Sequence, residues 1–175
     1  MSAKIRAIFF RAGGNSLAIR AFMRSKCVGR WMNKKVLIVE DEIFVALEIE
    51  QIVEDAGFTV GAIAADREAA LAAANDCDIA LVDLNLRDGP TGPAIGMELA
   101  GQYGIRVIYV TANPAQIGAA AEAALGVITK PFRPHSLVAT LKLAATNGAG
   151  LEMAEISGFT PFPMPGSWSG SESRG

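Results

Sequence analysis

The sequence predicts an α/β fold in which a doubly wound, five-stranded parallel sheet carries helices on both faces. Short apolar, β-branched runs alternate along the chain with segments whose apolar residues recur at helical spacing. The runs are continuously apolar, which is typical of parallel strands covered on both faces. A chain of 175 residues, 51% hydrophobic and 19% charged, is sufficient for one such core and excludes a wholly disordered chain.

The first two strands are expected at residues 35–40 and 59–64. The first run (KVLIVE) leads into apolar residues at helical spacing that begin with Ile43 and end before Gly57. The second run (TVGAIA) is followed by Asp66, a suitable N-cap for an alanine-rich helix. Each strand is therefore followed by a helix.

The third and fourth strands are expected at residues 79–84 and 106–111. A loop with Gly and Pro separates the third strand from a helix at residues 94–103. After the fourth strand, Asn113 and a proline open an alanine-rich segment, since proline is favoured in the first turn of a helix.

The fifth strand is expected to be short. We predict that the alanine-rich helix ends near Gly126, that residues 127–129 form the strand, and that a last helix covers residues 134–145. The strands and helices together account for a single domain over residues 34–147.

Charge and composition set the two ends of the chain apart from this domain. The first 35 residues carry nine Lys or Arg and no acid, whereas the other 140 carry 7 basic and 18 acidic residues. We expect residues 1–33 to be a basic extension that is disordered, or that reflects a start assigned too far upstream, with Met32 as the natural start. A functional basic arm and a targeting segment are the alternatives. Residues 148–175, rich in Gly, Ser and Pro, are expected to be a disordered tail.

The tail also holds three aromatic residues that are candidates for docking: Phe159, Phe162 and Trp168. The alternative is a solvated tail without a partner.

The chain has too few cysteines and histidines for a disulfide framework or a zinc site. Cys27 and Cys77 form no CxxC pair, and His135 is the single histidine. No apolar run approaches the roughly 20 residues needed to cross a bilayer. We therefore expect a cytoplasmic protein without membrane contact.

Chemically useful side chains stand where the predicted strands end. Glu40 and Asp41 end the first strand, Asp83 lies near the end of the third, Thr111 ends the fourth, and Lys130 follows the fifth. Functional groups of parallel sheets gather at the carboxyl ends of the strands, so these residues are expected at one rim.

Three carboxylates at one rim repel one another unless a cation lies between them. Oxygen ligands of this number suit Mg²⁺. A lysine and a threonine beside such a metal provide the groups that hold a transferring phosphoryl group, and an aspartate is able to act as its nucleophile.

Four stretches carry a family resemblance: VLIVEDE at 36–42, ALVDLNL at 80–86, VIYVTA at 107–112 and TKPF at 129–132. In this order and approximate spacing they resemble the stand-alone, single-domain receiver domains of response regulators in two-component signalling. The resemblance covers residues 35–146 and implies a flavodoxin-like fold. Four stretches in register are specific where one alone is not.

The resemblance implies a role for each residue of the rim. The phosphoacceptor would be Asp83, the phosphoryl oxygens would be held by Thr111 and Lys130, and Pro131 would follow a cis peptide bond. Mg²⁺ would be held by the side chains of Glu40, Asp41 and Asp83 and by the main-chain carbonyl of Asn85.

One position departs from the family pattern. Receivers typically carry an aromatic residue or His three residues before the lysine, where this chain has Val127, and Tyr109 lies elsewhere. We expect the effect of phosphorylation to pass through Thr111 and the following loop, or through altered dimer contacts.

The resemblance implies a phosphoacceptor response regulator rather than an enzyme, with at most slow self-dephosphorylation. A sensor histidine kinase or phosphotransfer protein would supply the phosphoryl group, and a downstream protein would read it. The acidic domain disfavours direct nucleic-acid binding. The sequence leaves undecided whether the protein forms a homodimer.

Two alternatives remain. A receiver-like interaction module would not be phosphorylated at all. An aspartate-nucleophile phosphohydrolase ordinarily needs a second acid two residues after the nucleophile, where this chain has Asn85.

Overall fold

The computed structural model describes residues 33–146 and 156–163. Six strands form one sheet in the order β2-β1-β3-β4-β5-β6. Neighbouring strands are parallel except β5 and β6, which are antiparallel. The strand bounds are β1 Lys35–Val39, β2 Thr59–Ala64, β3 Ile79–Val82, β4 Arg106–Thr111, β5 Ala124–Thr129 and β6 Phe159–Pro161.

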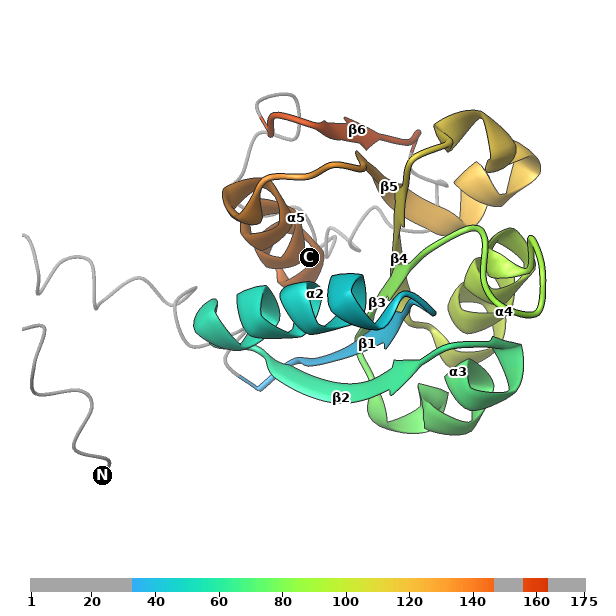
Figure 1. The fold of residues 1–175 in the computed structure, drawn as a ribbon, viewed down its shortest axis with the longest axis horizontal. Helices are drawn as coiled ribbons and strands as arrows, with labels where there is room; N and C mark the ends of the chain where they lie inside the picture. Colours follow the sequence, from blue (N-terminus) through green and yellow to red (C-terminus); the bar gives the residue numbers. More distant parts are fainter. Residues whose placement is uncertain (1–32, 147–155, 164–175) are drawn as a thin grey trace, which may run out of the picture.

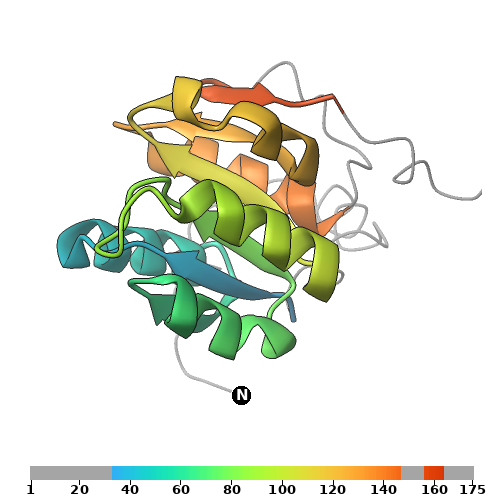
Figure 2. The ribbon, with the colours of Figure 1, turned by 90° about the vertical axis from the view of Figure 1, so that its right-hand side faces the viewer.

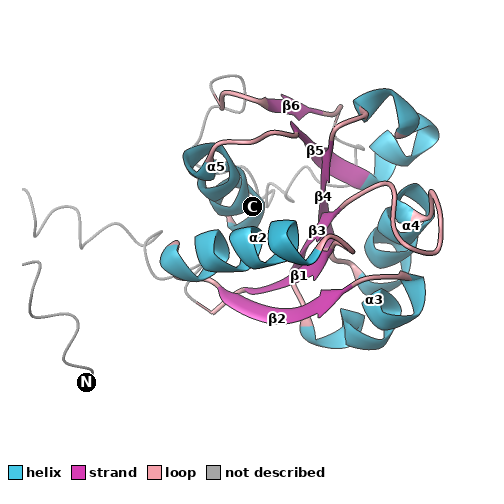
Figure 3. Cartoon of the chain, in the orientation of Figure 1, coloured by secondary structure: helices cyan, strands magenta, loops and turns pink. Residues whose placement is uncertain are grey.

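Helices cover both faces of the sheet, which confirms the predicted fold class (Figures 1 and 3). One buried cluster lies between the sheet and α2 and α5; the other lies between the sheet and α3, α4 and the 3₁₀ helix η4. The helix bounds are α2 Ile43–Asp55, α3 Arg67–Ala73, α4 Gly92–Tyr103 and α5 Pro134–Ala145, with 3₁₀ helices η2 Ala74–Asp76, η3 Pro114–Gln116 and η4 Gly118–Ala123. None of the helices in the described ranges has the length and apolar character to cross a bilayer.

The strands alternate between the two clusters as their pleat requires. In β1, Val36 and Ile38 face α2 and α5, whereas Leu37 and Val39 face α3 and α4. All four are fully buried. This two-sided burial explains why the strand is a continuous apolar run.

The helix predicted between Asn113 and Gly126 is wrong. The chain instead forms two short 3₁₀ helices, η3 and η4, and Gly118, the first residue of η4, has a φ of +54°. A left-handed residue cannot continue a right-handed helix, so the segment is divided there. Strand β5 consequently begins at Ala124, three residues before the predicted start.

The sixth strand was not predicted, and it comes from the segment expected to be a disordered tail. Phe159 packs into the cluster under α2 and α5, and Phe162 packs against the opposite cluster. Gly126 makes room for this strand, because a Cβ at that position would lie 2.6 Å from the Phe159 ring. Two of the three proposed docking aromatics therefore dock on the chain's own sheet. Trp168, the rest of the tail and the basic extension (1–32) lie outside the described residues.

Gly92 brings the start of α4 against the backbone that carries Asp83. Its amide donates to the Leu84 carbonyl at 3.1 Å. A Cβ on Gly92 would collide with the carbonyl of Asp83 and would lie 2.5 Å from the Leu84 Cα. These are backbone atoms, so no side-chain rotation relieves the collision.

We therefore expect Gly92→Ala to lower the free energy of unfolding by about 1–3 kcal/mol, the usual cost of overpacking. Chemical denaturation measures this change. The matched control is Gly101→Ala in the same helix, where a Cβ meets nothing within 4 Å. That variant should gain about 0.5–1 kcal/mol from helix propensity. Equal effects of the two substitutions would contradict the close approach at Gly92.

Candidate functional site

Main-chain hydrogen bonds of the sheet place the predicted site residues at one rim. The Glu40 amide donates to the Ala64 carbonyl at 2.8 Å, and the Asp83 amide donates to the Val39 carbonyl at 2.9 Å. The Lys130 amide donates to the Thr111 carbonyl at 2.9 Å. Each ladder thus continues one residue past its strand, which fixes the backbone beneath each side chain.

Lys130 bridges two buried carboxylates at this rim. Its Nζ lies 2.6 Å from Glu40 Oε2 and 2.7 Å from Asp83 Oδ2. Glu40 is 3% exposed and Asp83 is 8% exposed. Short charge-assisted bonds of this kind in a poorly solvated position are stronger than ordinary surface ion pairs.

The second oxygen of each carboxylate is held by the backbone. The Leu84 amide donates to Asp83 Oδ1 at 2.6 Å, and the Glu42 amide donates to Glu40 Oε1 at 3.3 Å. Both carboxylates are therefore fixed in orientation before any ligand arrives.

Burial shifts the pKa values of two of these groups. Burial raises the pKa of the Glu40 carboxyl, and the hydrogen bond from Lys130 offsets only part of that rise. Burial alone would lower the pKa of Lys130, but hydrogen bonds to Asp83 and Glu40 outweigh it and raise the pKa. The ammonium thus keeps its charge at neutral pH.

The other predicted residues lie around this core in different ways. Thr111 is buried, and its Oγ1 accepts a hydrogen bond from the Asn113 amide at 3.2 Å. Asp41 is exposed. Asn85 is exposed too, and its Nδ2 donates to Gln116 Oε1 at 3.0 Å. Glu40 and Asp83 therefore converge with Lys130, whereas Asp41 does not join them.

Comparison with known proteins gives the family of this chain. The model of the response regulator receiver domain family matches residues 36–142. This chain is a response regulator receiver domain.

Relatives of known sequence include two bacterial regulators. The chain is 32% identical over 118 residues to the phyllosphere-induced regulator PhyR of Methylorubrum extorquens, with 65% of this chain and 44% of PhyR aligned. It is 29% identical over 115 residues to the regulatory protein VanR of Enterococcus faecium, with 63% and 49% aligned. The chain thus spans about half the length of these curated relatives.

Solved structures show the same fold. The receiver domain of Erythrobacter litoralis PhyR has a TM-score of 0.59 and 29% identity, covering 64% of this chain and 89% of that one. A CheY-like receiver domain from Methanospirillum hungatei has a TM-score of 0.58 and 28% identity, covering 66% and 95%.

The receiver has a cis peptide bond between Lys130 and Pro131, as the resemblance implied. Val127, which stands where receivers typically have an aromatic residue, is 2% exposed. Its partner across the β4–β5 ladder is Tyr109, which is fully buried. The Tyr109 hydroxyl donates to the Pro93 carbonyl at 3.3 Å. The aromatic ring thus lies on β4 rather than at the Val127 position of β5. It is inside the core and hydrogen-bonded to the backbone of α4.

The side chains at the rim fit Mg²⁺ by the chemistry of their donors. Receiver domains typically bind this ion at the phosphorylation site. Carboxylate and carbonyl oxygens, the ligands that Mg²⁺ prefers, are present in Glu40, Asp83, the adjacent Asp41 and the main chain of Asn85. Within the described residues, however, no three His, Cys, Asp or Glu side chains already form a metal cluster.

The first turn of α2 exposes an apolar surface that the sequence analysis missed. Ile43 and Leu47 belong to the apolar residues at helical spacing, yet they are 57% and 46% exposed, and Phe44 is 85% exposed. Beside it lies a hollow of about 350 Å³ lined by Val45, Glu48, Ala112, Lys130, Pro131 and Phe132. We name Ile43, Phe44 and Leu47 the α2 patch. Phe44 lies off the helical face that buries Ala46, Ile49 and Val53. A large aromatic residue at such a position was the sequence signal that could have indicated an exposed apolar surface.

We expect Lys130→Met to lower the free energy of unfolding at pH 7 by about 3 kcal/mol, the low end for breaking a buried ion pair, because it leaves two buried carboxylates facing each other. Loss of the cation raises the pKa of Glu40 further in the folded state than in the unfolded chain. The deficit should therefore shrink as the pH falls through that raised pKa. Urea denaturation across pH 5–8 measures it.

The matched control is Lys34→Met, which removes a half-exposed ion pair of 2.5 Å with Asp78. Its cost should stay below about 1 kcal/mol. A Lys130→Met deficit that is small, or that does not change between neutral and acid pH, would contradict the bridging role.

Proposed function

We propose that this receiver accepts a phosphoryl group on Asp83 from a phosphohistidine of a sensor kinase or phosphotransfer protein. The observation that carries the proposal is the bridge from Lys130 to Asp83 and Glu40 at the carboxyl rim. It presents a nucleophilic carboxylate beside a fixed cation, which is the arrangement that phosphoryl transfer needs.

In the proposed transfer, an Asp83 carboxylate oxygen attacks the phosphorus of the donor. The P–N bond to the donor imidazole breaks, a P–O bond to Asp83 forms, and the imidazole leaves with the electron pair of the broken bond. Lys130 turns from the carboxylates toward the added phosphoryl oxygens, and the Thr111 hydroxyl donates to one of them. The starting geometry supports this, because the Lys130 ammonium already lies 2.7 Å from Asp83.

Mg²⁺ belongs to the proposal as the second source of positive charge. Glu40, Asp41, Asp83 and the carbonyl of Asn85 would hold it, and it would neutralise charge on the phosphoryl oxygens when bound. Two buried carboxylates and an exposed third against one lysine leave an excess of negative charge that favours a cation.

The protein would be a signalling component and not an enzyme, with loss of the phosphoryl group by slow hydrolysis. Asn85 supports this over a phosphohydrolase, because a hydrolase needs an acid at that position. The second candidate is an interaction module that is never phosphorylated. The ion pairs of Lys130 with Glu40 and Asp83 argue against it, because they bring a candidate nucleophile and a cation together.

The α2 patch is the surface we assign to the phosphodonor protein. It exposes three large apolar side chains on the helix that follows β1 and Glu40. Large exposed apolar side chains mark protein-binding sites. We also assign the reading of the output to a protein rather than to nucleic acid, because residues 36–175 carry 7 basic and 18 acidic side chains. Both partners would be proteins of the cytoplasm. In keeping with this, the related PhyR of Bartonella quintana is named an anti-anti-sigma factor.

Incubation with acetyl phosphate and Mg²⁺ should add one phosphoryl group to the protein, seen as an intact-mass gain. Asp83→Ala should gain nothing, because it lacks the nucleophile. The control Asp78→Ala, which removes a carboxylate at the other end of β3, should be labelled like the parent.

The outcomes separate the three functions. A mass gain that survives Asp83→Ala would place the acceptor elsewhere. No gain in the parent would favour the interaction module. Continuous release of inorganic phosphate at enzyme-like rates would favour the hydrolase.

We further expect Phe44→Ala to weaken binding of a phosphorylated phosphotransfer protein by about tenfold, the loss typical of one exposed aromatic anchor. Labelling by acetyl phosphate should not change, because that donor needs no protein surface. Transfer measured at subsaturating donor protein tests this. Met97→Ala is the control, since Met97 is 50% exposed on α4, on the opposite face of the sheet. An equal loss of labelling with acetyl phosphate and with the phosphotransfer protein would mean that Phe44 affects the phosphoacceptor site rather than donor binding.

A further inference from the structure

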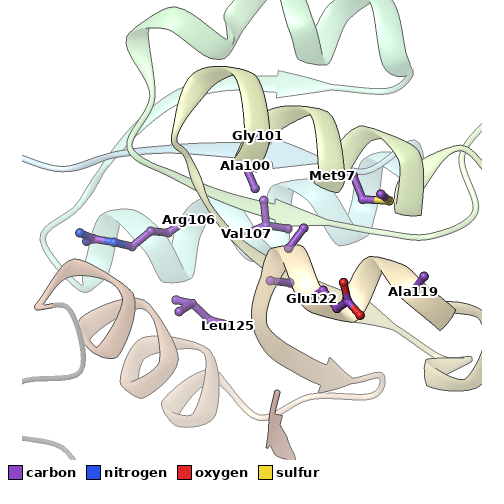
Figure 4. A pocket seen from close by; sticks show the side chains of 10 residues that line it. Met97, Ala100, Gly101, Arg106, Val107, Ala119, Glu122 and Leu125 are labelled. Atoms are coloured by element: carbon purple, nitrogen blue, oxygen red, sulfur yellow. The ribbon is translucent and has the colours of Figure 1, made fainter. Parts of the chain in front are cut away.

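A groove of about 310 Å³ lies between α4 and η4, on the face of the sheet away from α2 and α5 (Figure 4). Arg106 and Leu125 lie toward one end, and Met97 and Ala119 toward the other. Its size is at the lower end of the range of pockets that hold a ligand or side chain. The lining residues belong to α4, η4 and the first residues of β4 and β5, so the groove is far along the strands from the phosphoacceptor rim.

Small residues and an irregular backbone create the groove. Ala100 and Gly101 of α4 face Ala119 and Ala123 of η4, so little side-chain volume fills the space between the helices. The β4–β5 register also shifts between Val107 and Ile108, where Val107 pairs with Ala124 and Ile108 pairs with Gly126. The result is a mostly apolar hollow whose lining includes the half-exposed Met97 and two charged side chains, Arg106 and Glu122.

The described chain ends beside this groove. The Phe162 amide donates to the carbonyl of Leu125, a lining residue, at 3.0 Å. The Phe162 side chain packs against the cluster that contains Ala120 and Ala124. Figure 2 shows the last strand (red) next to the gold segment near residue 120, with the yellow-green helix α4 below it. Strand β6 therefore delivers the chain to the groove on the same face of the sheet.

Residues 164–175 follow directly, and they contain one large aromatic side chain, Trp168. Trp168 follows Pro163 by five positions, a reach of about 17 Å when extended. The wall of the groove on α4 runs from Met97 to Gly101, about 6 Å of helix. The segment has only two charged side chains, Glu172 and Arg174, and its large apolar side chains are Met164 and Trp168.

We propose that residues 164–175 of the same chain occupy the groove between α4 and η4, with the Trp168 indole as the anchor. This is an interaction surface beyond the phosphoacceptor site. With the segment in place, a partner protein reaches this part of α4 and η4 only by displacing it.

Tryptophan fluorescence tests the proposal in the full-length chain. Trp31 and Trp168 are the two tryptophans, so Trp31→Phe leaves Trp168 as the single reporter. Its emission should lie at shorter wavelength, and acrylamide should quench it less, than in a free peptide of residues 164–175. Emission equal to that of the peptide would overturn the proposal, and would leave the groove to a separate partner.

Two further variants locate the anchor. Gly101→Leu fills the groove and should return the emission and quenching to the peptide values. It should not unfold the helix, because a Cβ at Gly101 meets nothing within 4 Å. Gln102→Leu adds the same side chain to an exposed neighbour that does not line the groove, and should change neither value. A shifted emission that survives Gly101→Leu would place Trp168 elsewhere, and one that fades on dilution would mean that a second copy supplies the segment. Either result would overturn the proposal.

Discussion

The ion bridge centred on Lys130 is the interaction on which the arrangement of the carboxyl rim depends. Two carboxylates that come from different strands, Glu40 after β1 and Asp83 after β3, are both within 2.7 Å of one ammonium. Without that cation, keeping both carboxylates charged in their buried positions would cost several kcal/mol. The same lysine therefore holds together two strand ends that would otherwise repel each other.

The fold positions this bridge through main-chain bonds rather than through side-chain packing. The sheet ladder runs one residue beyond β1, β3 and β5, so Glu40, Asp83 and Lys130 start from fixed points. Gly92 then draws α4 against the backbone of Asp83. The missing side chain of Gly92 thus allows α4 to begin directly against the backbone that carries the Asp83 carboxylate.

Much of this was predictable from the sequence, because continuous apolar runs and helical spacing report directly on burial. The parallel sheet, the N-cap at Asp66, which accepts from the Ala69 amide at 2.9 Å, and the convergence of Glu40 and Asp83 all follow from that pattern. The pattern misled where tertiary contacts dominate. Gly118 divides the segment after Asn113 into 3₁₀ turns, and Ile43 and Leu47 keep helical spacing but remain exposed. Strand β6 is too short to show any periodicity, and two phenylalanines on opposite faces of the sheet hold it in place.

That short strand also changes what the sheet offers to other molecules. Strand β5 is apolar and almost wholly buried, and an uncovered edge of this kind is a template for uncontrolled pairing between chains and for aggregation. Strand β6 replaces it at the border with three residues that end in Pro161, which has no amide hydrogen to donate. Strand β6 thus covers an edge that would favour aggregation. A chain that ended before Phe159 would expose the edge of β5 to pairing with other chains.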